Sequence, residues 1–129
     1  MKIKTNELTG IALDWAVAKA RDVRVNISDI TSGTLVVDII LLWAGHYDEF
    51  GILTYEPSTD WSIAGPIIEE EHIDISWMNP GYYCSKQGLY GATHFGTGTT
   101  LLTATMRAYV SSKLGNEIEI PDELANEEK

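Results

Sequence analysis

The residues with the clearest chemical potential form a glycine- and threonine-rich run before the last predicted helix. The run consists of Gly96, Thr97, Gly98, Thr99 and Thr100. Glycines let backbone N–H groups approach a ligand, threonine hydroxyls add donors, and a helix N-terminus attracts an anion. The run lacks both the lysine of a P-loop and the third glycine of a dinucleotide fingerprint. It predicts either an anion site or a flexible loop with a threonine cap.

Two basic side chains flank this run. His94 precedes it, and Arg107 lies about two turns into the following helix. The planar guanidinium of an arginine matches phosphate oxygens, so both residues are candidates for recognising a phosphate. The alternatives are a loop histidine and a salt bridge between Arg107 and the acidic run Glu69–Glu71.

A second candidate site combines short polar side chains with a tryptophan. Its residues are Ser58, Thr59, Asp60 and Trp61. The indole could form a wall on which a purine or another planar group stacks, while Asp60 could accept from ribose hydroxyls. The alternative is a helix cap with Trp61 as a core anchor. We therefore predict ligand-binding roles for these residues and for those around the glycine–threonine run, and no catalytic residue.

The remaining reactive side chains form no recognisable metal or nucleophile site. The three histidines are dispersed, and Cys84 lacks the paired spacing of a zinc site. A Cys84–His94 pair is conceivable but has no nucleophile motif, so a small buried cysteine is the better interpretation. We expect no metal, no cofactor and a binding protein rather than an enzyme.

Hydrophobic periodicity indicates the elements that position these residues. It predicts main helices at about 9–20 and 99–114, the second ended by Gly115, and short helical turns near 60–71 that Gly65-Pro66 stops or redirects. Alternation predicts strands at 73–77 and 118–120, while 88–99 is expected to be a long connection. The fold class is α+β, with a small antiparallel or mixed sheet packed against two main helices.

Length and charge limit the domain count and the partners. The 129 residues suit one domain, which we place at 1–121, with an acidic, mobile C-terminal tail at 122–129. The net charge of −10 repels a phosphate backbone, so no nucleic acid is expected as a partner. No apolar stretch has the length of a spanning helix, so no membrane partner is expected either.

Several colinear segments resemble the NinX family of small phage proteins. The central one is Tyr55–Glu69, and the opening Met1–Gly10, the stretch Ala12–Ala18 and the stretch Met106–Pro121 resemble the family as well. The resemblance implies a phage accessory protein expressed in the cytoplasm of an infected bacterium. It brings no catalytic mechanism.

Three functions compete on the sequence alone. The first is a non-enzymatic binder of a small anionic or nucleotide-derived molecule, which in a phage could sequester a host immune signal. The second is an adaptor or inhibitor that contacts a host protein through the acidic surface. The third is a small nucleotide hydrolase that uses Asp60, His94 or a glutamate as base. A homo-oligomer would favour the first, because a small domain gains an enclosed pocket most easily at a symmetric interface.

Overall fold

The computed structural model of the chain describes residues 1–23, 25–29, 34–37, 46–47, 53–88 and 91–125. Its helices are η1 (Thr5–Glu7), α1 (Gly10–Ala20), α2 (Trp61–Glu70), α3 (Leu101–Leu114) and α4 (Asp122–Ala125), where η1 is a 3-10 helix. The helix α3 begins where the Thr100 side chain accepts the Thr103 N–H, and it ends at Gly115, whose φ of 91° suits a residue without a Cβ. Both predicted main helices are confirmed.

The described strands pair into three antiparallel sheets. Their bounds are β1 (Lys2–Lys4), β2 (Val25–Asp29), β3 (Thr34–Val37), β4 (His46–Tyr47), β5 (Leu53–Thr54), β6 (Asp74–Met78), β7 (Gly81–Gln87), β8 (Thr93–Gly98) and β9 (Glu117–Glu119). One sheet is the pair β1–β9, the second has the order β2-β3-β5-β4, and the third has the order β6-β7-β8. The predicted α+β class and the strands near 73–77 and 118–120 are therefore confirmed.

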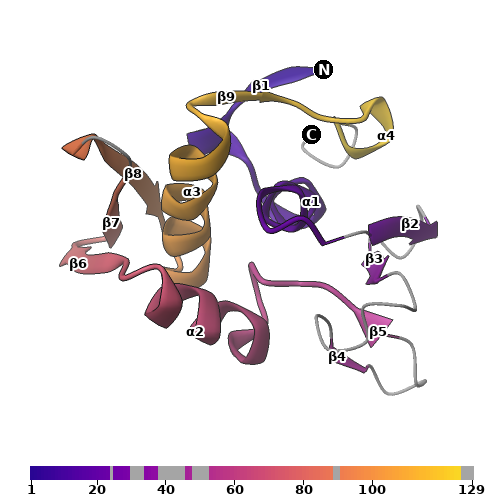
Figure 1. Ribbon diagram of the computed structural model, residues 1–129, viewed down its shortest axis with the longest axis horizontal. Helices are drawn as coiled ribbons and strands as arrows, with labels where there is room; N and C mark the ends of the chain where they lie inside the picture. The colour runs from indigo at the N-terminus through magenta and orange to yellow at the C-terminus, as the bar shows by residue number, and fades with distance from the viewer. Residues whose placement is uncertain (24, 30–33, 38–45, 48–52, 89–90, 126–129) are drawn as a thin grey trace.

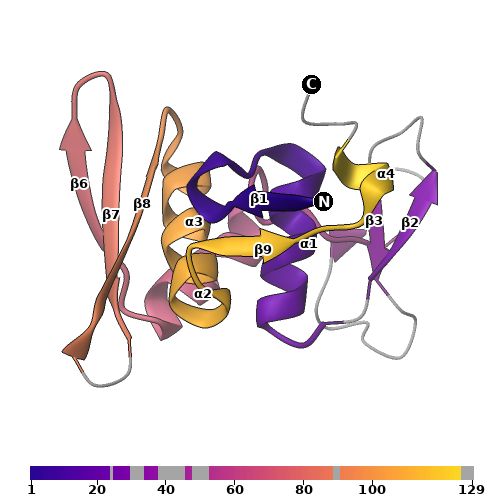
Figure 2. The same cartoon turned by 90° about the horizontal axis from the view of Figure 1, so that it is seen from above.

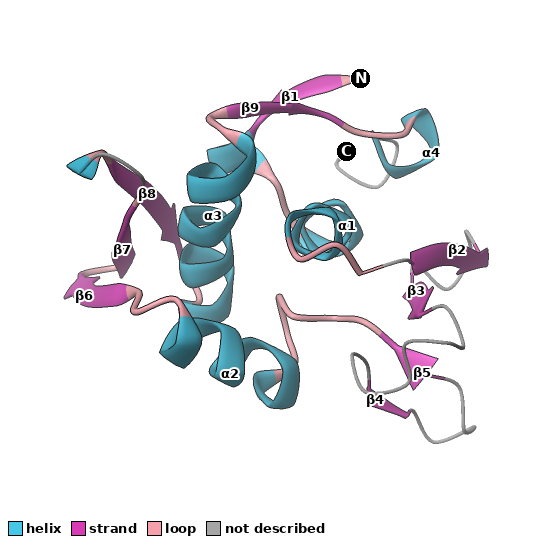
Figure 3. Cartoon of the chain, viewed as in Figure 1, coloured by secondary structure: helices cyan, strands magenta, loops and turns pink. Residues whose placement is uncertain are grey.

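The helices α1 and α3 lie in the middle of the molecule, with the β6-β7-β8 sheet on one side, the β2-β3-β5-β4 sheet on the other and α2 below (Figures 1 and 3). The helices α1 and α3 pack against each other, and the β1–β9 ribbon passes over both. The β6-β7-β8 sheet packs on the other side of α3, with β8 nearest the helix and β6 farthest from it (Figure 2). The segment that contains the predicted glycine–threonine site thus runs from the sheet strand nearest the helical core into the start of α3.

Close packing of β8 on α3 depends on small residues. Ala104 and Ala108 of α3 are fully buried, and Gly96 of β8 faces them. A Cβ on Gly96 would overlap the backbone at both alanines. The helix and strand backbones can therefore approach closely only because Gly96 has no side chain.

Two local predictions are wrong. The expected long connection at 88–99 contains the six-residue strand β8, which pairs with β7 along its whole length. Glycine and threonine made this segment look irregular, but ladder hydrogen bonds and packing on α3 decide its conformation. The expected stop at Gly65-Pro66 lies inside the continuous helix α2. Gly65 has no Cβ to clash with the proline ring, which allows the residue before Pro66 to stay helical.

The two ends of the described chain meet on one side of the molecule. The N-terminal amino group of Met1 donates to the Ile120 carbonyl oxygen over 2.8 Å. Leu124 of α4 is only 1% exposed, so this residue of the expected tail packs on the core, whereas 126–129 lie outside the described residues. The division into a domain and a tail stays a prediction. Among the described helices, none combines the length and apolar character needed to cross a membrane.

Candidate functional site

The start of α3 lies at the centre of the candidate site. The Thr100 Oγ1 accepts the Thr103 N–H over 3.2 Å and donates to the Thr103 Oγ1 over 2.9 Å. The predicted threonine cap is therefore confirmed at Thr100. The cap serves only one of the N–H groups in the first turn, and the positive end of the helix dipole remains directed at the surface beside Thr99 and Thr100.

Trp61 and the start of α3 line one pocket of about 370 Å³, here called the Trp61 pocket. It is lined by Gly10, Ser58, Thr59, Trp61, Thr100, Leu101, Leu102 and Thr103. The Trp61 side chain is 55% exposed, so it is not the core anchor of the alternative prediction. Residues separated by about forty positions in the sequence thus converge because α1, α2 and α3 all begin near this point.

A second pocket of about 560 Å³ lies on the other side of the α3 start, here called the Arg107 pocket. It is lined by Thr9, Met78, Pro80, Gly81, Tyr82, Tyr83, Thr97, Gly98, Thr99, Thr103 and Arg107. Thr103 belongs to both pockets, so the first turn of α3 separates two adjoining concavities. Together they contain most of the predicted ligand-binding residues.

Backbone carbonyl groups hold the Arg107 guanidinium in place. Its Nε donates to the Leu8 carbonyl oxygen over 2.8 Å, and one terminal nitrogen donates to the Thr97 carbonyl oxygen over 2.6 Å. The acidic run that was the alternative partner serves other cations: Glu70 pairs with Arg21 at 2.9 Å, and Glu71 lies 3.4 Å from Lys86 and 3.7 Å from Lys113. Arg107 therefore ties β8 to the segment before α1 and adds positive charge to its pocket.

Two predicted residues of β8 do not line these pockets. Gly96 is buried against α3, so its role is packing. His94 pairs with Lys86 in the β7–β8 register, toward the end of β8 away from the α3 start. Neither residue is among those that line the Trp61 or Arg107 pocket. Only the C-terminal part of the glycine–threonine run lies at the candidate site.

The polar residues before α2 have different positions. Asp60 caps α2: its Oδ1 accepts the Ser62 N–H over 2.9 Å and the Ser62 hydroxyl over 2.6 Å. Thr59 is exposed at the Trp61 pocket, whereas Ser58 is only 6% exposed. The predicted helix cap is therefore confirmed at Asp60, and Ser58 and Thr59 contribute to the pocket wall.

Asp14 is a buried residue that the sequence interpretation did not connect with the site. Its side chain is 5% exposed, and its Oδ1 accepts the Ser58 N–H over 2.8 Å. Burial raises the pKa of this carboxyl group to about 7, partly offset by the hydrogen bonds from Ser58. The one sequence signal was an acidic residue between Leu13 and Trp15 in an apolar helix. The hydrogen bond between Asp14 and Ser58 thus connects the wall of the Trp61 pocket to α1.

The two pockets differ in charge from the chain as a whole. The net charge is −10, yet no residue lining either pocket is acidic, and Arg107 is the one lysine or arginine among the lining residues. Because a carboxylate in the wall would repel an anion, the lack of acidic lining residues favours an anion at the α3 start.

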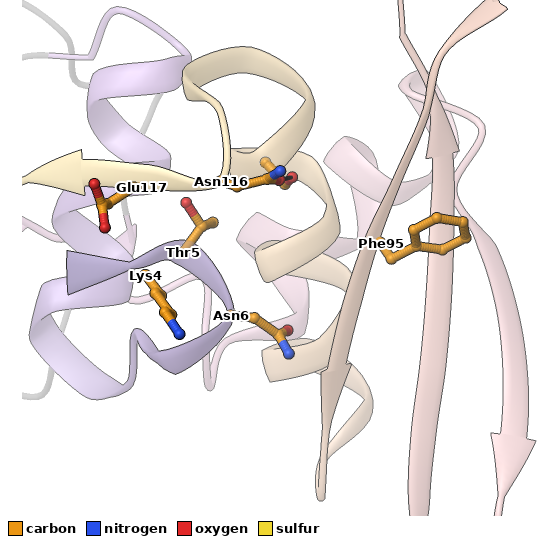
Figure 4. A pocket seen from close by; sticks show the side chains of 7 residues that line it. Lys4, Thr5, Asn6, Phe95, Asn116 and Glu117 are labelled. Carbon is orange, nitrogen blue, oxygen red and sulfur yellow. Dashed lines mark hydrogen bonds between the residues drawn. The ribbon is translucent and has the colours of Figure 1, made fainter.

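A third pocket of about 460 Å³ lies where η1 and β9 meet α3 and β8 (Figure 4). Its polar groups largely satisfy one another. Thr5 Oγ1 donates to the Gly115 carbonyl oxygen over 2.6 Å, and Ser111 Oγ donates to Asn116 Oδ1 over 2.8 Å. Phe95 points away from these side chains in the close view. The pocket contains none of the predicted ligand-binding residues.

The other predicted reactive groups form no site. The described residues contain no group of histidine, cysteine and acidic side chains that could hold a metal. Cys84 is buried, and burial raises the pKa of its thiol to about 11, which disfavours a nucleophilic thiolate. The interpretation of Cys84 as a small buried residue is confirmed.

A family comparison agrees with the resemblance found in the sequence. Residues 4–113 match the family described as Bacteriophage P22, NinX. This chain belongs to that family. The match covers α1, α2, all three strands of the β6-β7-β8 sheet and most of α3, so it includes both pockets at the α3 start. It identifies a phage accessory protein. No curated protein matches the chain.

Proposed function

We propose that this phage accessory protein binds a small anionic, nucleotide-derived molecule without changing it, and that it acts against host defence by sequestering an immune signal of this chemistry. The observation that carries the proposal is the convergence of exposed Trp61 and the start of α3 in one pocket. The indole offers a stacking surface for a planar base, and the helix start offers N–H groups and threonine hydroxyls to an anion.

The size and charge of the region support the same class of ligand. Pockets of about 370 and 560 Å³ lie within the usual range for small-molecule sites. The bound position of Arg107 leaves a fixed positive charge in the wall of the second pocket. A ligand with a ring at Trp61 and a phosphate beside Thr99 and Thr103 would use both pockets at once.

Binding is better supported than hydrolysis. The candidate bases were Asp60, His94 or a glutamate, and neither pocket is lined by any of them. The Asp60 Oδ1 already accepts two hydrogen bonds from Ser62. A general base must reach the proton that it removes, directly or through one water. The geometry therefore favours a protein that releases its ligand intact.

Thermal unfolding against a panel of mononucleotides, cyclic dinucleotides and ADP-ribose derivatives tests the proposal. A ligand at about one hundred times its Kd stabilises the folded state by about 2.7 kcal/mol, which raises Tm by roughly 8 °C in a domain of this size. Mass spectrometry of the recovered ligand should show an unchanged mass. No shift with any anion of the panel, on folded protein, would contradict binding, and a changed mass would replace it with catalysis.

Two matched aromatic variants locate the site. Trp61→Ala is expected to weaken binding by about tenfold or more, because stacking on an aromatic contributes about 1–3 kcal/mol per base. Trp15→Ala removes a partly buried tryptophan of α1 that lines none of the three pockets, so it should leave the affinity unchanged. Calorimetry with the best ligand measures both. A loss only in Trp15→Ala would move the site away from α3.

A further inference from the structure

The edge strand β6 carries side chains that no described part of the chain covers. All five of its residues are exposed, including Ile75 at 43%, Trp77 at 60% and Met78 at 60%. The strand pairs with β7 on one side and is the edge of the three-stranded sheet on the other. Figure 2 shows it as the strand farthest from α3. An edge of this kind presents unpaired N–H and carbonyl groups together with apolar side chains.

The register shows how the apolar groups of β6 are arranged. Ile75 pairs with Cys84 and Trp77 pairs with Tyr82, so both lie on the sheet face that packs on α3. They extend beyond the helix, and the Trp77 ring rests edge-on against Tyr82 with centroids 5.0 Å apart. Ile75 and Trp77 therefore continue the apolar face of the sheet beyond the part that α3 covers.

We propose that β6 is the contact surface of a symmetric homodimer, in which the β6 strands of two copies pair antiparallel about Ser76. This register places Ile75 of one protomer opposite Trp77 of the other, on the same face of the joined sheet. It places Asp74 opposite Met78, so the acidic side chains lie at opposite ends of the interface. The result is a continuous six-stranded sheet with both copies of α3 on one face.

The charge of the sheet favours a second copy of the chain over a basic protein as the partner of β6. Between positions 74 and 98 the sequence contains one acidic residue, Asp74, and one lysine, Lys86, although the chain as a whole has a charge of −10. The sheet is thus a nearly neutral region of an acidic protein, on which two copies can meet without strong repulsion. A basic partner would instead prefer the acidic surface elsewhere. The strand also lacks the lysine, proline or bulge that usually protects a free edge.

Cysteine cross-linking at the symmetry axis tests both the dimer and its register. Ser76 is exposed and lies opposite itself in the proposed pairing, at a Cβ separation of about 5 Å that a disulfide can bridge after a small adjustment. Under mild oxidation, Ser76→Cys should form covalent dimers on the order of tenfold faster than the matched exposed-strand control Thr93→Cys. The native Cys84 is buried and should not react.

Sedimentation measured from nanomolar to high micromolar protein gives the second readout. The unmodified chain should change reversibly from monomer to dimer, whereas Ser76→Lys should remain a monomer, because it places two like charges directly opposite each other. A monomer at every concentration would overturn the proposal. So would equal cross-linking of Ser76→Cys and Thr93→Cys, or a dimer that persists in Ser76→Lys, since each would place the contact on another surface.

Discussion

The two edges of the β6-β7-β8 sheet use their side chains in opposite ways. At the β8 edge, Gly96 presses on α3, the Asn6 side chain exchanges two hydrogen bonds with Thr97, and Arg107 donates to the Thr97 carbonyl oxygen. At the β6 edge, every side chain of the strand is exposed. The edge that is rich in glycine and threonine is therefore the packed one, and the edge that is rich in apolar residues faces outward.

This contrast shows why residue types alone misplace function. Glycines beside a helix start are typical of anion-binding loops, but a glycine also allows a strand to lie directly on a helix. An alternating apolar strand is typical of a half-buried position, but the same alternation on an edge strand leaves its apolar face outside the core. Only the three-dimensional neighbours decide between the alternatives, and substitutions at each edge can measure the difference.

The largest effect is expected from Gly96→Ala at the packed edge. The added Cβ would overlap the backbone of α3, so the strand and the helix would have to separate, at a cost of about 4 kcal/mol or more in the free energy of unfolding. Urea denaturation followed by circular dichroism measures this. Gly98→Ala is the matched control, because its Cβ would lie 3.1 Å from the Thr103 Cγ2 and 3.2 Å from the Ala104 backbone nitrogen, close contacts without overlap that should cost about 1 kcal/mol. Equal losses would mean that Gly96 is not a packing residue.

The buried Asp14 should make stability depend on pH. Its carboxyl group has a folded pKa of about 7 and an ordinary value of 3.8, so the folded state holds a proton that the unfolded state releases. The contribution of Asp14 to stability is therefore fully present below pH 3.8 and is lost as the pH rises to 7, by an amount on the order of 4 kcal/mol.

Asp14→Asn separates this effect from other titrating groups. Its amide oxygen can still accept the Ser58 N–H, but it has no proton to lose. Denaturation at a series of pH values should show the difference in stability between Asp14→Asn and the unmodified protein increasing in favour of the variant from pH 4 to pH 7. Parallel curves would show that Asp14 titrates at its ordinary pKa.

Arg107→Ala tests the second contact of the packed edge. It removes charge-assisted hydrogen bonds to the Leu8 and Thr97 carbonyl oxygens and should lower the free energy of unfolding by about 2–3 kcal/mol. Arg107→Lys keeps the charge but not the planar fork, so it should restore less than half of the loss. The same denaturation measures both variants. Full rescue by lysine would mean that the positive charge stabilises the fold and that the two hydrogen bonds do not.

Sequence reasoning predicted the elements whose signals are local. The threonine cap and Gly115 define the ends of α3, and the alternation at 73–77 predicts the strand β6. It missed β8, because the ladder partners and α3, and not the propensities of glycine and threonine, make this segment a strand. It also predicted that the chain leaves the helix at Gly65-Pro66, but Gly65 has no Cβ to clash with the proline ring and the helix continues.

For the candidate site, the sequence supplied the residues but not their grouping. Trp61 and Thr100 share a pocket because three helix starts meet, which depends on tertiary packing. The same packing separates His94 and Gly96 from that pocket although they are neighbours of Thr100 in the chain. Asp14 was missed because its partner is a backbone N–H of Ser58, forty-four positions away, which no local pattern reveals.

A smaller effect is expected when the β8 edge is uncovered. Asn6→Ala removes a donor to the Thr97 hydroxyl and an acceptor for the Thr97 N–H, both at 2.9 Å and both exposed, so the cost should be about 1 kcal/mol. Hydrogen exchange of the Thr97 amide should become faster. Asn6→Asp keeps the acceptor and should retain most of the protection. Unchanged exchange in Asn6→Ala would show that Asn6 does not seal this edge.

The smallest effect on the monomer is expected at the open edge. Trp77→Ala removes a large side chain, but the ring is 60% exposed and its described aromatic neighbour is Tyr82, so the loss should stay below about 1 kcal/mol. Denaturation at nanomolar protein, where a weak homodimer would be dissociated, measures this. Met106→Ala, at a fully buried position of α3, should cost about 2–5 kcal/mol under the same conditions. If Trp77→Ala cost as much, β6 would belong to the core of the single chain, and the contrast between the two edges would not hold.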